Sequence, residues 1–200
     1  MPTEGDEGDL LSEISDFDLV RHLLADLHDD LSGKIARSRQ LVDLSDALGS
    51  FGTMLFGGEI TDAGWREARW SFIHGNFAAT VLICQAPAEH LLGSYVYAAL
   101  PMSDFPKRAS FAETLRRCQE RSVISDKDAV DLRRLMDLRN PLSHFRDVND
   151  PGSIFRRVLS TMEPAQEHLR RDAGFAIGLA VRLLALPVFR LGSITRGETT

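Results

Sequence analysis

Apolar side chains recur at spacings of three and four along most of the chain, which is the period of an α-helix with one buried face. The first such stretch follows Ser15 and carries Phe17, Val20, Leu24, Leu27 and Leu31. The last covers residues 163–186, with Leu169, Ala173, Ile177, Ala180 and Leu184 at its inner positions. No stretch alternates with a period of two for long enough to indicate a β-sheet. The pattern predicts an all-α protein, most simply an antiparallel helical bundle.

Serine residues followed three positions later by an acidic residue mark the starts of several predicted helices. These capping sequences are Ser15–Asp18, Ser110–Glu113 and Ser125–Asp128. Thr61 is the predicted cap of another helix, whose apolar stripe continues to residue 99. We expect that helix to be kinked or interrupted at Pro87, because proline removes one hydrogen bond and clashes with the preceding turn. Two shorter helices should follow, separated by a turn at residues 122–125.

The segment 49–58 contains four glycines and no helical period, so it is predicted to be a linker. We therefore divide the chain into a disordered acidic tail (1–9), a helical arm with its linker (10–58), a helical bundle (59–192) and a flexible tail (193–200). An amphipathic arm outside the bundle needs a cover for its apolar face. Such an arm could bind a partner or be exchanged between two copies of the chain.

Composition indicates a folded protein of the cytoplasm. The chain is 44% hydrophobic and 26% charged, and its two cysteines, Cys84 and Cys118, fall in apolar helical patterns, as buried thiols do in a reducing compartment. Residues 1–9 carry four acidic side chains and no basic one, unlike a secretory signal peptide. The longest apolar run, 173–194, is interrupted by Arg182 and Arg190, which argues against a membrane span.

The net charge of −6 is unevenly distributed. Residues 1–62 hold 14 acidic and 4 basic side chains, whereas residues 107–146 hold 6 acidic and 10 basic ones. An acidic protein cannot coat nucleic acid in general, so any contact with a polyanion has to be local. An ordinary solvated helix face explains the basic segment equally well.

Candidate chemistry is concentrated in residues 135–146. Counted from Ala129, Leu132 and Met136, the next position on the buried stripe is occupied by Arg139. A guanidinium on an apolar face needs a partner, an opening or a subunit interface. Pro141 disfavours helical geometry at the residue before it and suits the first position of a helix. We therefore predict that Asn140 caps a new helix and that His144 lies in its first turns.

That arrangement would suit phosphate chemistry. Backbone amides at a helix N-terminus attract phosphate and favour a neutral imidazole. Arg139 could stabilise charge on a phosphorane-like transition state, while His144 takes or gives a proton at a ribose hydroxyl or leaving oxygen. Such a site could cleave RNA without a metal, through attack of the RNA's 2′-hydroxyl on the adjacent phosphate. DNA lacks this hydroxyl and would not be cleaved. The structural alternative is a buried hydrogen-bond node.

Arg139-Asn140 followed by His144 resembles the R-x4-H motif of the HEPN superfamily, in its Arg-Asn-x-x-x-His form. The resemblance extends over about residues 61–186, because a long helix carrying Glu89, a variable linker and two shorter helices precede the motif in the family order. It implies a bundle of HEPN type and a homodimer in which Arg139, Asn140 and His144 of two copies share a cleft. It also implies a metal-independent ribonuclease of toxin–antitoxin, anti-phage or CRISPR-associated systems.

The chain departs from one family pattern after the histidine. Some relatives are silenced by modification of a tyrosine at this place, whereas Phe145 and Arg146 stand here, which puts that control in doubt. Arg146 could instead contact RNA phosphate, with Ser143 and Arg134 as further supporting residues. Glu89 is expected to pair with Arg139 and orient it. No histidine pair has convincing metal-ligand spacing, so neither a metal nor another cofactor is expected.

Two functions follow from these residues. The first is a metal-independent endoribonuclease that acts on single-stranded RNA as a homodimer, with an antitoxin or regulatory protein as a further partner and no contact with membranes. The second is a non-catalytic HEPN-like regulatory or protein-binding module, which the overall acidity and the missing tyrosine favour.

Overall fold

Eight α-helices account for most of the residues that the computed structural model describes, which are 15–47, 49, 52–99 and 108–191. Their bounds are α1 (Asp16–His28), α2 (Leu31–Asp46), α3 (Gly58–Ile73), α4 (Phe77–Ala99), α5 (Phe111–Glu120), α6 (Asp126–Ser143), α7 (Ile154–Thr161) and α8 (Ala165–Leu184). A 3₁₀ turn, η1 (Pro187–Phe189), follows, and these residues contain no β-strand. The predicted all-α class is confirmed. The tails predicted at 1–9 and 193–200 lie outside the described residues.

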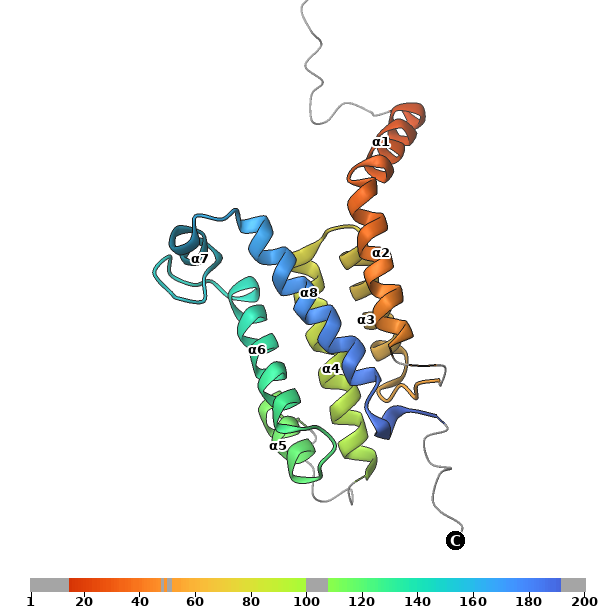
Figure 1. Cartoon of the computed structure of the whole chain (residues 1–200), viewed down its shortest axis with the longest axis vertical. Coiled ribbons are helices and arrows are strands. Elements are labelled where there is room, and N and C mark those ends of the chain that lie inside the picture. The colour runs from red at the N-terminus through yellow and green to blue at the C-terminus, as the bar shows by residue number, and fades with distance from the viewer. Residues whose placement is uncertain (1–14, 48, 50–51, 100–107, 192–200) are drawn as a thin grey trace, which may run out of the picture.

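Helix α4 lies at the centre of the bundle and packs against α3, α5, α6 and α8 (Figure 1). It runs antiparallel to α3 and to α6. The core side chains come mainly from α4 and α8, with others from α3, α5 and α6. The largest fully buried ones include Phe72, Val81, Leu91, Leu92, Leu115, Leu132, Leu135, Ile177, Leu179 and Leu183.

The turn between α3 and α4 lies at Gly75, where one continuous helix with an interruption at Pro87 was predicted. Gly75 adopts φ 78°, a left-handed conformation that glycine reaches without strain, and it ends α3. Pro87 lies buried within the continuous helix α4. Its ring fills the space beside Gly64 of α3, where a Cβ atom would come within 2.6 Å of Pro87 Cγ. The apolar period alone could not place this break, because the stripe continues across the turn.

Serine side chains cap the helices where the sequence predicted. Ser15, Ser110 and Ser125 accept hydrogen bonds from the backbone N–H groups of Asp18, Glu113 and Asp128. Thr61 does not cap α3, because that helix already begins at Gly58 after Gly57, which has φ 89°. Thr61 is therefore buried one turn inside the helix.

Glu113 pairs with two arginines of its own helix. The Arg116 and Arg117 guanidiniums donate to this carboxylate at 2.6 and 2.8 Å and lower its pKa to about 2 from a usual 4.5. A lowered folded-state pKa stabilises the fold above pH 4.5, and this contribution is lost as the pH falls towards 2. We expect the unfolding free energy of Glu113→Gln to fall less between pH 6 and pH 3 than that of the wild type, as measured by urea denaturation at both pH values. Equal losses in the two proteins would contradict the assignment.

The two predicted arm helices differ in how they contact the bundle. In α2, Leu41 is buried in the core and Leu44 packs against it. After α2, the backbone N–H of Met54 donates to the carbonyl oxygen of Phe189 at 2.7 Å, and the Phe56 ring packs edge-on against Tyr95. Helix α1 buries no residue and projects beyond the end of the bundle (Figure 1). In the described part of the chain, none of the helices has both the length and the apolar character needed to cross a membrane.

Candidate functional site

The predicted new helix at Pro141 does not form, because α6 continues through Pro141 to Ser143. His144 is the residue that ends α6, and its backbone N–H donates to the carbonyl oxygen of Asn140 at 3.0 Å. Asn140 is thus inside the last turn of a helix rather than at the start of one. The site therefore lies at the carbonyl end of a helix dipole, which attracts cations and offers no free amides to a phosphate.

Tertiary packing explains why the helix continues. Leu138 and Leu142 lie on either side of Asn140 and pack against the core, so α6 stays helical at a residue that proline would otherwise push towards an extended conformation. Pro141 has no N–H, and the carbonyl oxygen of Asp137 therefore loses its helical donor near the end of α6. Arg139 is half-buried beside the stripe rather than in its centre, because Leu135, Leu138 and Leu142 occupy the inner positions.

Alanine substitutions distinguish the observed helix from the predicted one. We expect Pro141→Ala to raise the unfolding free energy by about 1 kcal/mol, because it restores the hydrogen bond to Asp137. Asn140→Ala should change it by less than about 0.5 kcal/mol, since Asn140 caps nothing. Urea denaturation followed by circular dichroism measures both values. A loss of about 1 kcal/mol in Asn140→Ala would instead indicate an N-cap.

Arg139 and His144 come together at the surface. Arg139 Nη1 lies 3.4 Å from His144 Nε2, a long contact that is open to solvent. A guanidinium can only donate, so a hydrogen bond here requires the tautomer in which Nε2 accepts. An unprotonated ring nitrogen beside a cation is the pair that proton abstraction next to a phosphate requires. Neither side chain has a carboxylate partner among the described residues.

The supporting residues lie at different distances from this pair. The Ser143 hydroxyl donates to the carbonyl oxygen of Arg139 at 3.0 Å, so it belongs to the same turn. Arg146 pairs with Asp150 at 3.7 Å, and the Arg134 guanidinium lies 4.2 Å from the centre of the Phe175 ring. Glu89 is half-buried on α4, and no hydrogen bond or ion pair joins it to Arg139. The expected orientation of Arg139 by Glu89 is therefore not observed.

Much of the basic segment 107–146 is neutralised within the bundle. Arg116 pairs with Glu113 and Glu120, and Arg117 also pairs with Glu113. Two acidic residues of the segment, Asp128 and Asp131, pair with Arg182 of α8, whose Nε donates to Asp128 at 3.2 Å. Arg139 is one of several cations of this segment, with Arg121, Arg133 and Arg134, that have no carboxylate partner among the described residues.

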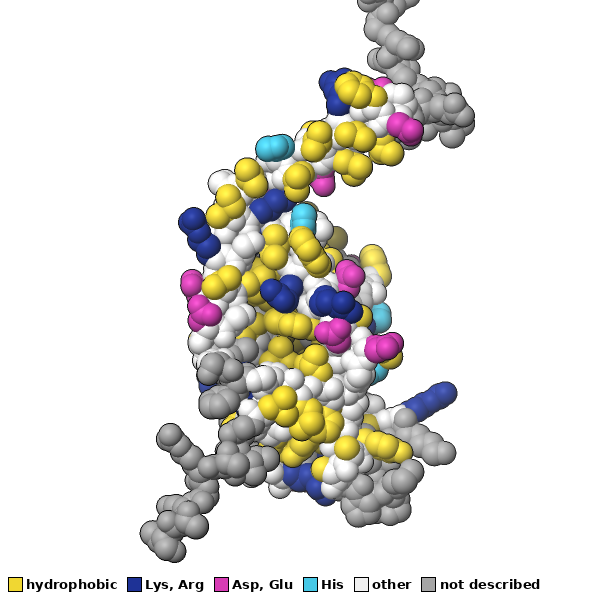
Figure 2. All heavy atoms as spheres, turned by 90° about the vertical axis from the view of Figure 1, so that its right-hand side faces the viewer, with side chains coloured by type: hydrophobic (Ala, Val, Ile, Leu, Met, Phe, Trp, Pro, Cys, Tyr) yellow, Lys and Arg dark blue, Asp and Glu magenta, His cyan; other side chains and the backbone are white. Residues whose placement is uncertain are grey.

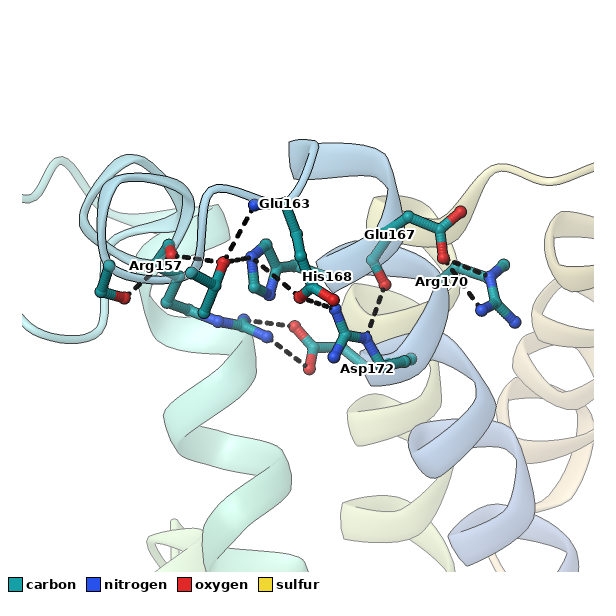
Figure 3. Close-up of polar contacts among 9 residues, drawn as sticks. Arg157, Glu163, Glu167, His168, Arg170 and Asp172 are labelled. Carbon is teal, nitrogen blue, oxygen red and sulfur yellow. Dashed lines mark hydrogen bonds and ion pairs between the residues drawn. The ribbon is translucent and has the colours of Figure 1, made fainter.

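A second polar cluster joins α7 to the first turns of α8 (Figure 3). Arg157 of α7 donates two hydrogen bonds to Asp172 of α8, at 2.5 and 3.1 Å, and Asp172 is only 4% exposed. His168, also 4% exposed, has its Nε2 2.9 Å from the Thr161 hydroxyl. At the rim, the Arg171 guanidinium beside Glu163 lowers the pKa of that carboxyl. Each polar group here has a partner, so the cluster fastens α7 to the bundle rather than offering free ligands.

Sequence reasoning missed this cluster. His168 and Asp172 are four residues apart on the buried face of α8, next to Leu169 and Ala173, and two polar residues at that spacing on an apolar face indicate a buried polar contact. Their partner Arg157 lies on a different helix, and its position could not be derived from spacing.

Nothing in the described residues gathers three or more metal-binding side chains. The cysteines are also far from nucleophilic. Burial raises the pKa of both Cys84 and Cys118 to about 12, so both thiols stay protonated near neutral pH. The pair Arg139–His144 therefore remains the candidate site.

Comparisons of the chain with protein-family models, with curated proteins and with solved structures give no match.

Proposed function

We propose that the chain is a metal-independent endoribonuclease of HEPN type that cleaves single-stranded RNA through Arg139 and His144. The observation that carries this proposal is the 3.4 Å contact of Arg139 Nη1 with His144 Nε2 on the open end of α6. His144 Nε2 takes the proton of a ribose 2′-hydroxyl, and the resulting oxygen attacks the adjacent phosphorus. Arg139 donates to the non-bridging phosphate oxygens as negative charge accumulates there. The bond to the 5′-oxygen breaks, leaving a 2′,3′-cyclic phosphate and a 5′-hydroxyl.

A second copy of the chain would supply the missing acid. The 5′-oxygen has to receive a proton, and His144 of a partner subunit facing the first would provide it. Exposed apolar residues at this end of the molecule support such an interface. Phe145 is 95% exposed next to His144, and Phe155, Leu159 and Met162 are exposed on or beside α7, which lies at the same end of the bundle (Figure 1). We place this homodimeric ribonuclease in a toxin–antitoxin or anti-phage setting, with an antitoxin as its regulator.

One observation favours the non-catalytic alternative. The pair lies at the carbonyl end of α6, so no backbone amides of that helix point outward to hold a phosphate. In this alternative, Phe145 and the apolar face of α7 bind a protein partner, and Arg139 contributes only charge to the interface.

RNA cleavage in EDTA tests the proposal. Purified full chain is incubated with a labelled single-stranded RNA and with DNA of the same sequence. We expect cleavage of the RNA alone and products that end in a cyclic phosphate. Intact RNA across a panel of sequences, or cleavage that remains unchanged in His144→Ala, would leave the protein-binding alternative.

A further inference from the structure

Helix α1 exposes a row of apolar side chains that the described residues of its own chain leave largely uncovered. The row consists of Phe17, Val20, Leu23, Leu24 and Leu27, all of them exposed and Phe17 by 71%. No residue of the 13-residue helix is buried. Isolated helices of about 12–15 residues are marginal in water, so most helix stability has to come from packing of an apolar face. This helix therefore needs a surface to pack against.

Hydrogen bonds and an ion pair fix the junction between α1 and α2. Lys34 Nζ of α2 donates to the carbonyl oxygen of Asp26 at 2.6 Å at the end of α1, and Asp30 between the helices adopts φ 46°. Arg37 pairs with Asp30 at 2.8 Å and donates from Nε to the carbonyl oxygen of Ile73 at 2.9 Å. The Arg37 contact also lowers the pKa of Asp30. These contacts fix the bend at which α1 leaves α2, and α1 projects beyond the end of the bundle (Figure 1).

A groove suited to an amphipathic helix lies on the adjacent face. It has a volume of about 380 Å³, lies mainly between α2 and α3, and is bordered at the end of α1 by Leu27, so the part of the apolar row free to leave is Phe17, Val20, Leu23 and Leu24. Its apolar lining includes Leu31, Ile35, Val42, Trp70 and Ile73. Trp70 is 60% exposed, although it is a large aromatic residue. Figure 2 shows hydrophobic side chains that continue from the projecting arm onto this face of the main body.

The charges of the arm and of the groove are opposite. Between residues 16 and 28, α1 carries Asp16, Asp18 and Asp26 against one arginine, Arg21. Arg39 lines the groove and Arg69 lines the hollow that adjoins it at Trp70, whereas Arg66 of that hollow is paired with Asp62 at 3.0 Å. Figure 2 shows Lys and Arg side chains among the hydrophobic ones on this face. An acidic amphipathic helix thus complements the apolar lining of this groove and the charges of Arg39 and Arg69.

We propose that α1 of one copy lies in the α2–α3 groove of a second copy, and that the exchange is reciprocal. Each chain then contributes one arm and one groove to a two-fold dimer. This interface is separate from the one that the ribonuclease proposal requires, because α6 and α7 lie on the opposite side of the bundle from α2 (Figure 1). The exchange does not depend on any catalytic role of His144.

Light scattering coupled to gel filtration tests the exchange with the full chain. We expect Leu24→Glu on the arm, and separately Trp70→Glu in the groove, to halve the particle mass of the wild type. Both side chains are exposed, and an unchanged helical signal in circular dichroism shows that the bundle is intact. Val130→Glu makes the same kind of change at a 60% exposed residue of α6 and should leave the mass unchanged.

Mixing the two variants identifies the contact. A pair made of one Leu24→Glu chain and one Trp70→Glu chain keeps one wild-type arm in one wild-type groove, so the mixture should regain dimers that neither variant forms alone. Pairing of arm with arm would give no such recovery and would overturn the proposal. A monomeric wild type, or a mass that Leu24→Glu leaves unchanged, would overturn it as well. If the wild type is monomeric and floats with phosphatidylcholine vesicles, the apolar row binds a lipid surface instead.

Discussion

Asp172→Ala should lower the free energy of unfolding by about 3 kcal/mol, because it leaves the Arg157 guanidinium without its carboxylate in a partly buried place. The pair is bidentate, at 2.5 and 3.1 Å, and the Asp172 side chain is almost inaccessible. Arg157 keeps some exposure, so the loss should lie at the low end of the range for buried pairs. Urea denaturation measures the loss, and hydrogen exchange should show that the α7 amides open more readily than in the wild type.

Two further variants distinguish the effect of the Arg157–Asp172 pair from that of removing any charge on α8. Arg170 and Glu167 form an exposed ion pair on the same helix, so Arg170→Ala should cost less than about 0.5 kcal/mol. The double variant Arg157→Met with Asp172→Leu removes both charges and should recover most of the loss, because apolar residues of similar size often replace a buried pair without cost. A loss in Asp172→Ala no larger than in Arg170→Ala would show that the pair does not fasten α7.

The loosening of α7 in Asp172→Ala should extend to the candidate site. The segment that leaves His144 enters α7 at Ser153, whose side chain accepts from the backbone N–H of Arg156 and caps the helix. Loosening of α7 therefore frees the segment that carries Phe145 and follows His144. The Arg157–Asp172 pair thus stabilises the end of the bundle on which the ribonuclease proposal depends.

The helix class and most helix starts could be predicted because they depend on local information. A serine that accepts from an amide three residues later acts within one turn, and the apolar period reports which face is buried. The predictions failed where a distant contact decided the outcome. Pro87 is accommodated by Gly64 of another helix, and Pro141 remains helical because Leu138 and Leu142 pack against the core.

The candidate site was predicted in part. The resemblance to the R-x4-H motif put Arg139 and His144 in one candidate site, and their side chains lie 3.4 Å apart. Their surroundings were predicted wrongly. A new helix was expected to begin at Pro141, whereas α6 continues to Ser143, so the pair lies at the carbonyl end of a helix dipole. Contacts between helices, such as Arg157 with Asp172, leave only a weak trace in the sequence, and the expected pair of Glu89 with Arg139 is not formed.

His144→Ala should reduce cleavage of single-stranded RNA in EDTA by about 10²- to 10⁴-fold, because it removes the group that takes the 2′-hydroxyl proton. Arg139→Ala should reduce the rate by about 10²- to 10³-fold, the loss expected when one donor to a developing oxyanion is removed. Arg139→Lys keeps the charge but not the planar group that contacts Nε2, so it should recover only part of the rate. Initial rates at saturating RNA measure these effects on the chemical step.

A control variant on the same helix distinguishes a role of Arg139 in the chemical step from a general effect of positive charge on RNA binding. Arg133 is exposed on α6 and donates to Gln119 at 2.8 Å, so Arg133→Ala removes one positive charge without touching the pair. Its rate at saturating RNA should stay within about threefold of the wild type, while its binding weakens slightly and more so at low salt. If Arg133→Ala and Arg139→Ala reduce the rate equally, Arg139 acts through charge alone, and the assignment of Arg139 to the phosphate oxygens fails.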